Sequence, residues 1–417
     1  MIYVDDLRDW VGYMDSHPGV HTPNIDALRG ESFAFNRAYC SVPSCLGSRA
    51  STMWGLSPAT TGVDTTIAEG DQAYGPLLDS AALTLPEVLS NRGWTTYSRG
   101  KIFHNALPDR WDVASPYPEI QELLDTSNPT FWQTLFDYGV LPVGEVHTDQ
   151  ATVNWCVQQL QSPNLPFFMA VGLYQPHVPW RVPQWAYDQH PIDEVVIPQP
   201  NCVDDLDDVP AAAVELAARP RLYSTTNDEL VEASGQRRAL VQAYLASITH
   251  TDAMVGQLLN ELDASPYGDE TSVVLVSDHG YHLGEKLHWR KSTLWEQATR
   301  VPLLVRSPGL PAGGVLGRPV SMLDIAPTVL DAAGAASHPG FEGSSLIGIT
   351  AADADARPAI TQWQGNRSVR WRKWRYTTYP SGGEELYDLS LDPSECTNLS
   401  SDPAYASILT ILQAKLS

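Results

Sequence analysis

The chain has 417 residues, enough for a large hydrophobic core and for two structural units. Its 49 acidic residues outnumber the 26 Lys and Arg residues, and the resulting net charge of -23 disfavours nucleic-acid or anionic-membrane partners. The 5 cysteines are too few and too scattered for a disulfide scaffold, and no apolar run is long enough to span a membrane.

The first residues show no signal peptide, because Met1 leads directly into a short apolar run and two acids. As written, the sequence therefore predicts a cytoplasmic protein. Removal of a leader would leave the same start, so a periplasmic or secreted protein is the alternative.

The first predicted strand, Ile2–Val4, ends in Asp5 and Asp6. Carboxylates at the carboxyl end of a strand lie where an α/β sheet places its site. Adjacent strand residues point to opposite faces, so both carboxylates reach one ion only if the backbone bends here. A solvated pair of loop acids is the alternative interpretation of these two residues alone.

A helix is predicted to start at Cys45, because Pro43 and Ser44 end the preceding run and Ser44 is a suitable N-cap. Arg49 then lies one turn later on the same face. Free N–H groups, the helix dipole and the guanidinium make a positive field, which suits a nucleophile that attacks an anionic centre. A buried structural cysteine is the alternative.

Two further strands lead to basic or imidazole groups. The strand Thr95–Ser98 is followed by Lys101 and His104, which can share a face. The apolar run Pro166–Leu173 is typical of a central strand and leads to His177, whose loop is stiffened by flanking prolines. An incidental surface lysine and packed histidines are the alternatives.

The clearest buried strand, Thr271–Ser277, ends in Asp278 and His279, and Lys291 follows shortly after. Acid and imidazole groups again stand at the carboxyl end of a strand.

Two helices are predicted between these strands. Asp149 is expected to cap a helix over Gln150–Leu160, and a longer helix runs from about Gly235 to Leu262. Asp252 lies within the longer helix, where we expect a structural role.

The composition of the sequence changes from residue 311, where a Gly- and Pro-rich link leads to a capped helix, Ser321–Leu330. Strands at Gln362–Trp363 and Trp374–Tyr379, with a turn at residues 381–383, precede a closing helix over residues 403–416. The sequence therefore predicts an α/β domain over residues 1–310 and a smaller α+β subdomain over residues 311–417.

The candidate ligands and cations form one constellation. Mostly oxygen ligands favour a hard cation, Ca²⁺ or Mg²⁺, although the histidine leaves a transition metal open. Cleavage of an anionic ester needs such an ion, cations, a fixed nucleophile and an acid for the leaving oxygen. The ligands are Asp5, Asp6, Asp278 and His279, and the other groups are Arg49, Lys101, Lys291, His104 and His177.

The stretch from Cys45 to Arg49 resembles the Cys-x-Pro-Ser-Arg signature of type I sulfatases. Nearly end to end, the order of motifs resembles sulfatases of the alkaline-phosphatase superfamily, most closely the iduronate-2-sulfatase-like branch. This resemblance implies a large mixed central sheet sandwiched by helices. The matching stretches are Val4–Trp10, His21–Asp26, Gly100–His104, Gln175–Trp180, Ser277–Gly280 with Lys291, Glu385–Asp388, Asp392–Pro393 and Thr397–Leu399.

The resemblance also implies a modified nucleophile and a metal. Cys45 would be converted by a formylglycine-generating enzyme to formylglycine, whose hydrate is the nucleophile. Asp5, Asp6, Asp278 and His279 would hold a divalent ion, Ca²⁺ by preference, that also contacts residue 45.

The remaining roles follow the same resemblance. Arg49 and Lys101 would steady the hydrate, and His104 would hydrogen-bond it and help expel sulfate. His177 and Lys291 would bind sulfate and assist the leaving alcohol.

The sequence departs from the family at Gly47, where the signature has proline, and at Gln175, where the branch usually has lysine. Because that proline belongs to the motif read by the maturing enzyme, one alternative is an unmodified, non-catalytic binder of sulfated glycans. A phosphate or phosphonate ester hydrolase on the same fold is another, although only one metal's ligands are found.

The branch implies a small sulfated substrate, a sugar or uronic acid. A basic island near the C-terminus could hold a carboxylate or a second sulfate, and a cationic outward face of a hairpin is the alternative. The island comprises Arg367, Arg370, Arg372, Lys373 and Arg375. Trp180, Trp363 and Trp371 could stack on sugar rings, but core packing is the default for tryptophan.

Overall fold

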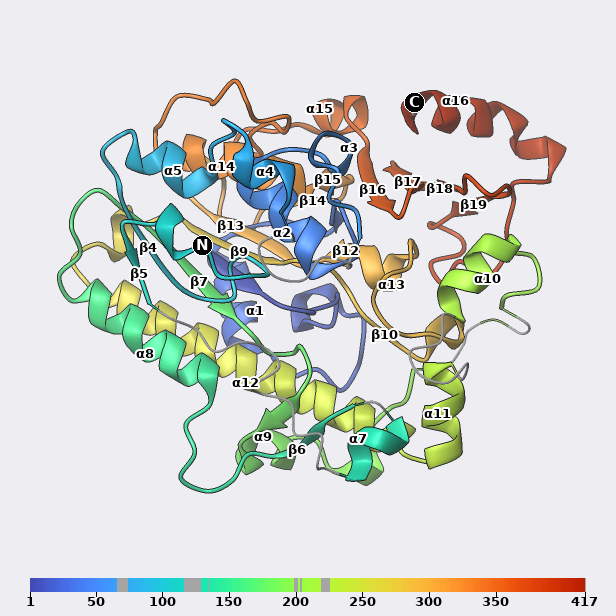
Figure 1. The fold of residues 1–417 in the computed structure, drawn as a ribbon, viewed down its shortest axis with the longest axis horizontal. Coiled ribbons are helices and arrows are strands. Elements are labelled where there is room, and N and C mark those ends of the chain that lie inside the picture. The colour runs from blue at the N-terminus through green and yellow to red at the C-terminus, as the bar shows by residue number, and fades with distance from the viewer. Residues whose placement is uncertain are drawn as a thin grey trace.

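A computed structural model of the chain describes residues 1–65, 74–115, 129–134, 136–198, 202, 205–218 and 226–416. Within these residues the largest sheet has eight strands and lies at the centre of the molecule (Figure 1). In order across the sheet they are β14 (Val315–Leu316), β2 (Phe33–Phe35), β13 (Leu303–Arg306), β9 (Val273–Ser277), β1 (Ile2–Val4), β7 (Phe167–Leu173), β4 (Thr95–Gly100) and β5 (Val113–Ala114).

Parallel pairing dominates the middle of this sheet. β1 pairs in parallel with β7 on one side and with β9 on the other, and β4 pairs in parallel with β7. β13 runs antiparallel to β9 and β2, so the predicted mixed sheet is confirmed. The carboxyl ends of β1, β4, β7 and β9 therefore meet at one edge, where open α/β sheets place their sites.

Side chains of the strands alternate between two hydrophobic cores, one on each face of the sheet. Ile2 and Val4 pack into one core, and Tyr3 between them packs into the other. Figure 1 shows α8 and α12 below the sheet and α2, α5 and α14 above it, which confirms the predicted sandwich. The first core is covered by α1 (Pro23–Glu31), α8 (Thr148–Leu160) and α12 (Arg237–Asp263), and the second by α2 (Cys45–Trp54), α5 (Leu85–Ser90) and α14 (Ile325–Ala332).

Shorter elements complete the described part of the chain. The helices are α3 (Pro58–Thr61), α4 (Pro76–Asp79), α7 (Pro129–Thr134), α9 (Gln184–Asp188), α10 (Ala211–Ala217), α11 (Asn227–Ser234), α13 (Glu296–Thr299) and α15 (Ala351–Ala356). The strands are β3 (Ala38–Tyr39), β6 (Tyr138–Val140), β8 (Trp180–Val182), β10 (His282–Leu283), β11 (Trp289–Arg290), β12 (Arg300–Val301) and β15 (Val320–Ser321).

The C-terminal region forms a separate antiparallel sheet, at the upper right of Figure 1. Val369, Tyr376 and Leu386 of its strands pack against Leu412 and Leu416 of the closing helix. The predicted turn at residues 381–383 joins its last two strands, and the division of the chain at residues 310 and 311 stays a prediction. The strands are β16 (Ala359–Trp363), β17 (Asn366–Trp371), β18 (Trp374–Thr378) and β19 (Glu384–Asp388), and the helix is α16 (Ala406–Leu416).

Asp252 of α12 has a structural role, as expected. Its carboxylate accepts the backbone N–H groups of Asn24 at 3.1 Å and Ile25 at 2.8 Å. These are free N–H groups in the first turn of α1, so Asp252 fixes the start of α1 on α12.

Cysteine pairing is sparse. Cys202 and Cys396 form a disulfide between residues 194 positions apart, and Cys40, Cys45 and Cys156 are free and buried. A single disulfide among the described residues is no scaffold, in agreement with the sequence. None of the described helices combines the length and apolar character that a membrane span requires.

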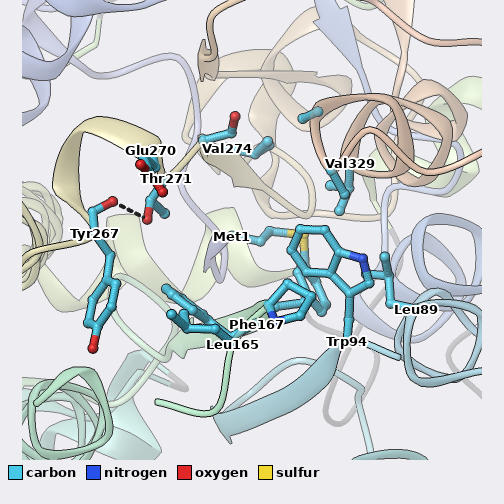
Figure 2. Close-up of a pocket in the computed structure, with 15 residues that line it drawn as sticks. Met1, Leu89, Trp94, Leu165, Phe167, Tyr267, Glu270, Thr271, Val274 and Val329 are labelled. Atoms are coloured by element: carbon cyan, nitrogen blue, oxygen red, sulfur yellow. Dashed lines mark hydrogen bonds between the residues drawn. The ribbon is translucent and has the colours of Figure 1, made fainter. Parts of the chain in front are cut away.

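An apolar cavity of about 390 Å³ lies at the amino ends of the central strands (Figure 2). Met1 before β1, Trp94 before β4 and Phe167 at the start of β7 line it. The predicted site residues follow the carboxyl ends of the same strands, so the cavity lies at the opposite edge of the sheet.

Candidate active site

The two acids after β1 reach the same place because the backbone bends between them. Asp6 has a φ of 59°, in the left-handed region that ordinary residues rarely adopt. Its backbone N–H donates to Asp278 Oδ1 at 3.0 Å, which joins the end of β1 to the end of β9. The bend that the sequence required for a shared ion is therefore present.

Cys45 is the first residue of α2, as predicted, and is 3% exposed. Ser44 has the extended backbone of an N-cap, although its side chain makes no capping hydrogen bond. The Cys45 sulfur lies 3.4 Å from Asp5 Oδ1, 3.3 Å from His279 Nε2 and 2.8 Å from Lys291 Nζ. The residues that the sequence placed on three separate elements thus converge on this sulfur.

Arg49 and Lys101 are buried cations that pair with the acids. Arg49 Nε donates to Asp278 Oδ2 at 2.8 Å, and its Nη2 lies 3.4 Å from Asp5 Oδ1. Lys101 donates to Asp5 Oδ2. The Arg49 guanidinium also lies over the ring of Tyr3, 4.5 Å from its centroid, and this cation–π support had no signal in the sequence.

His177 and Lys291 lie beside Asp6. Lys291 Nζ lies 2.6 Å from Asp6 Oδ1, and His177 Nε2 lies 3.8 Å from Asp6 Oδ2. His177 Nδ1 lies 2.6 Å from the carbonyl oxygen of Val178, which favours the tautomer with the proton on Nδ1. The Tyr174 hydroxyl, 2.9 Å from the same nitrogen, is a positioning contact that sequence reasoning missed.

His104 lies on the loop after β4. Its backbone N–H donates to the Tyr74 hydroxyl at 2.6 Å, and its buried Nδ1 has no hydrogen-bond partner among the described residues. Hydrogen bonding from His104 also contributes to lowering the pKa of Cys45. All of the predicted site residues are therefore brought together.

The charges around Cys45 favour its anionic form. Burial by itself would raise the pKa of the thiol, but Lys101, Lys291 and His279 together lower it well below its usual range. Burial opposes the positive charge of Lys291, yet Asp6 and Cys45 raise its pKa above the usual range. The site therefore stabilises negative charge at position 45.

The donor atoms fit a divalent cation. One ligand atom from each of Asp5, Asp6, Cys45 and His279 lies within 4.8 Å of the others, and all four residues are buried. Asp6 Oδ2 has no hydrogen-bond partner among the described residues, although burying a polar atom unpaired is costly. Asp278 Oδ2 is 3.6 Å from His279 Nε2, at the edge of this group.

Gly47 has a packing explanation. A Cβ built there would lie 2.6 Å from the carbonyl oxygen of Val63 and 2.7 Å from a methyl of Val42. Carbon atoms do not approach so closely without movement, so the space of the signature proline is filled by Val42 and the chain at Val63. A side chain at residue 47 would therefore require Val42 or the chain at Val63 to move.

We expect Gly47→Ala to lower the free energy of unfolding by about 1–3 kcal/mol, the usual cost of overpacking. This loss outweighs the gain of about 0.5–1 kcal/mol that alanine brings to a helix interior. Urea denaturation measures the change. The matched control is Gly30→Ala in α1, where a Cβ meets nothing within 4 Å and no loss is expected. An equal gain in stability in both variants would contradict the packing explanation.

Gln175, the other departure, faces away from the site. Its side chain is 1% exposed, and its Nε2 donates to the carbonyl oxygen of Pro179 at 2.8 Å.

Asp149 was predicted to cap a helix over Gln150–Leu160, and this prediction is wrong: α8 begins at Thr148 and is capped by His147. Asp149 instead accepts the N–H groups of Tyr174 and Gln175, at 2.7 and 2.9 Å, which no sequence pattern indicated.

Most of the basic island is occupied within the protein. Arg370 and Arg375 are buried, and both pair with Glu296. Arg372 pairs with Asp355, and Lys373 pairs with Asp388. Trp180 and Trp363 are core residues, 0% and 1% exposed. The island therefore serves mainly to hold β17 and β18 in place.

Comparisons with known proteins agree on the family. A family profile described as Sulfatase matches residues 1–335, and one described as N-sulphoglucosamine sulphohydrolase, C-terminal, matches residues 284–417. A sulfatase of Formosa agariphila is 33% identical over 100% of this chain and 85% of its own length. The iduronate 2-sulfatase of Mus musculus is 29% identical over 75% of this chain, which spans 60% of that relative.

A solved structure, described as a complex with its substrate D-glucosamine-2-N,6-O-disulfate, matches with a TM-score of 0.78. It is 21% identical to this chain, and the match covers 100% of this chain and 96% of that one. At this identity the likeness concerns the fold alone.

Proposed function

The chain belongs to the sulfatase family, a family of sulfuric ester hydrolases within the alkaline-phosphatase superfamily, and on that premise we propose that it acts on a small sulfated sugar or uronic acid through a formylglycine at position 45. The gathering of three carboxylates, three cations and three histidines around position 45 carries this proposal, with Asp5, His279 and Lys291 in contact with the sulfur itself. A formylglycine-generating enzyme would be the partner in maturation.

Charge balance supports a bound divalent cation. Three carboxylates face three cations, so the side chains alone leave little net charge to attract an anionic ester. Asp5, Asp6, Asp278 and His279 would hold the ion together with residue 45, and Ca²⁺ or Mg²⁺ suits the oxygen-rich set. Such an ion would supply positive charge for the sulfate oxygens.

When residue 45 is formylglycine, its hydrate supplies two hydroxyl groups on one carbon. The oxygen of one would attack sulfur, and loss of the proton from the other would re-form the aldehyde and release sulfate. Arg49 and Lys101 would hold that hydrate from one side, because both already contact Asp5 beside Cys45. His104 would accept the proton of the second hydroxyl as the sulfate departs.

His177 and Lys291 would serve the leaving alcohol. Both lie beside Asp6, and Lys291 remains positively charged. A cation there offsets charge on the bridging oxygen, and His177 would give that oxygen a proton when its ring carries a second proton, on Nε2. The Val178 carbonyl and the Tyr174 hydroxyl hold the ring in this direction.

Turnover of paired sulfate and phosphate esters tests the function. We expect protein matured beside a formylglycine-generating enzyme to hydrolyse 4-nitrophenyl sulfate and a set of sulfated monosaccharides far faster than the matching phosphates. A preference for the phosphate esters would favour the alternative of a phosphate or phosphonate ester hydrolase on the same fold. Binding of sulfated sugars without turnover, by protein that carries the modification, would favour the non-catalytic alternative.

A further inference from the structure

A second polar cluster lies buried behind the loop that carries His177. It consists of His147 at the start of α8, Asp149 two residues later, and His250 in the middle of α12. Their ligand atoms lie within 4.8 Å of one another, and the two imidazole rings are 4.3 Å apart between centroids. None of these residues belongs to the cluster around Cys45.

Two buried polar atoms at this cluster lack partners. His250 is 2% exposed, and its Nδ1 has no hydrogen-bond partner among the described residues; the same holds for Oε1 of Gln175. Gln175 Nε2 lies 3.3 Å from His147 Nε2, so its amide borders the cluster. Buried polar atoms are rarely left unpaired, and two at one place point to a missing ligand.

The cluster also lacks a cation. Asp149 is 0% exposed, and among the described residues no Lys or Arg pairs with its carboxylate. Burial raises the pKa of Asp149 to about 7 and lowers the pKa of His147 to about 4. Burial lowers the pKa of His250 too, and its Nδ1 is the ring nitrogen without a partner among the described residues, whereas His147 Nδ1 accepts the Asp149 N–H at 3.0 Å.

We propose that His147, Asp149 and His250 bind a transition-metal ion of the zinc class. Two imidazoles with one carboxylate are typical ligands of such ions. His147 Nδ1 and Asp149 Oδ2 are 3.9 Å apart, and the ligands of a tetrahedral Zn²⁺ lie about 3.4 Å apart. A small shift would close the site, with His147 Nδ1 exchanging the Asp149 N–H that it accepts at 3.0 Å for the ion. His250 contributes the third ligand through its unpaired Nδ1.

Gln175 completes the surroundings of the ion. With Nδ1 of His147 on the metal, its Nε2 carries the proton and needs an acceptor. Turning the amide would bring the unpaired Oε1 of Gln175 to His147 Nε2, which is the second hydrogen bond that metal-bound histidines usually make, in exchange for the hydrogen bond from Gln175 Nε2 to the Pro179 carbonyl. The departure at residue 175 thus goes with this pair of histidines.

The ion would brace the catalytic loop. Asp149 already holds the N–H groups of Tyr174 and Gln175, and the Tyr174 hydroxyl contacts His177. Metal binding would tie this loop to both α8 and α12. Its role is positioning, because none of the three ligands contacts Cys45 or the acids around it among the contacts described above.

Diffraction from crystals of the wild-type protein soaked in Zn²⁺ gives the direct test. Anomalous scattering at the zinc edge is expected to show a peak within bonding distance of His147 and His250. A water molecule in that place, or no density at all, would overturn the proposal. A zinc peak confined to the cluster around Cys45 would overturn it equally.

Metal content in solution gives the second test. After Zn²⁺ loading and gel filtration, His250→Phe and His147→Gln are expected to carry one zinc per chain less than the wild type. The matched control is His190→Gln, since His190 is 4% exposed and contacts Thr249 beside His250. The thermal midpoint should rise with Zn²⁺ in the wild type and the control alone. Equal zinc content and equal thermal shifts in all four proteins would overturn the proposal, whatever their activities.

Discussion

Replacing Cys45 by alanine is expected to lower the rate of sulfate-ester hydrolysis by at least about 10³-fold, the scale of losing a nucleophile. The Cys45 sulfur contacts Asp5, His279 and Lys291, which places residue 45 at the centre of the site. The assay is turnover of a sulfated sugar by protein matured beside a formylglycine-generating enzyme.

Two companion variants sharpen this prediction. Cys156→Ala, which alters another free and buried cysteine, is the control and should keep its activity. Cys45→Ser should form at most one sulfate ester per chain, because a plain hydroxyl has no geminal partner to expel sulfate. Sustained turnover by Cys45→Ala, with wild-type circular dichroism, would contradict the assigned nucleophile.

Removal of the divalent cation is expected to abolish turnover and to lower the thermal midpoint. A ligand held at 100 times its dissociation constant stabilises the folded state by about 2.7 kcal/mol, and chelation removes that contribution. The measurement is differential scanning calorimetry with a calcium-selective chelator, followed by readdition of Ca²⁺ or Mg²⁺. Repeating the measurement on the His250→Phe variant, which lacks a proposed ligand of the cluster at α8 and α12, separates the effect of the ion at Cys45 from that of an ion at this second cluster.

The effect has a defined control and pH dependence. Asp278→Asn should show a much smaller thermal shift on adding Ca²⁺. Burial lowers the pKa of His279, but Asp278 more than offsets this and raises it to about 9, so a bound ion must displace a proton. Metal affinity should therefore rise as pH increases towards 9 and fall as pH decreases. A thermal midpoint indifferent to chelation at every pH would contradict the metal assignment.

The site was predictable from sequence because its residues follow strands. Asp5, Lys101 and Asp278 each come directly after, or within a few residues of, a parallel strand, and parallel strands bring their carboxyl ends to one edge. The backbone bend at Asp6 was predictable too, because two adjacent carboxylates can bind one ion only if the chain bends between them. The mixed character of the sheet came only from the family resemblance, because apolar runs do not show which strand is reversed.

The contacts that support the site were not predictable. Tyr3 lies beneath Arg49, and Asp149 holds the loop before His177, through contacts between residues distant in sequence. A run of cations near the C-terminus looked like an anion site, yet Arg370 and Arg375 are internal partners of Glu296. Spacing indicates which residues share an element, whereas these pairings depend on how elements pack.

The central claim is that Cys45 becomes the catalytic nucleophile although Gly47 replaces the signature proline. Mass spectrometry of the tryptic peptide Ala38–Arg49, from protein made in its native host or beside a maturing enzyme, tests it most directly. We expect the mass in which the CH₂SH group of Cys45 is replaced by CHO. An intact thiol in every preparation, including preparations that hydrolyse sulfate esters, would contradict the claim.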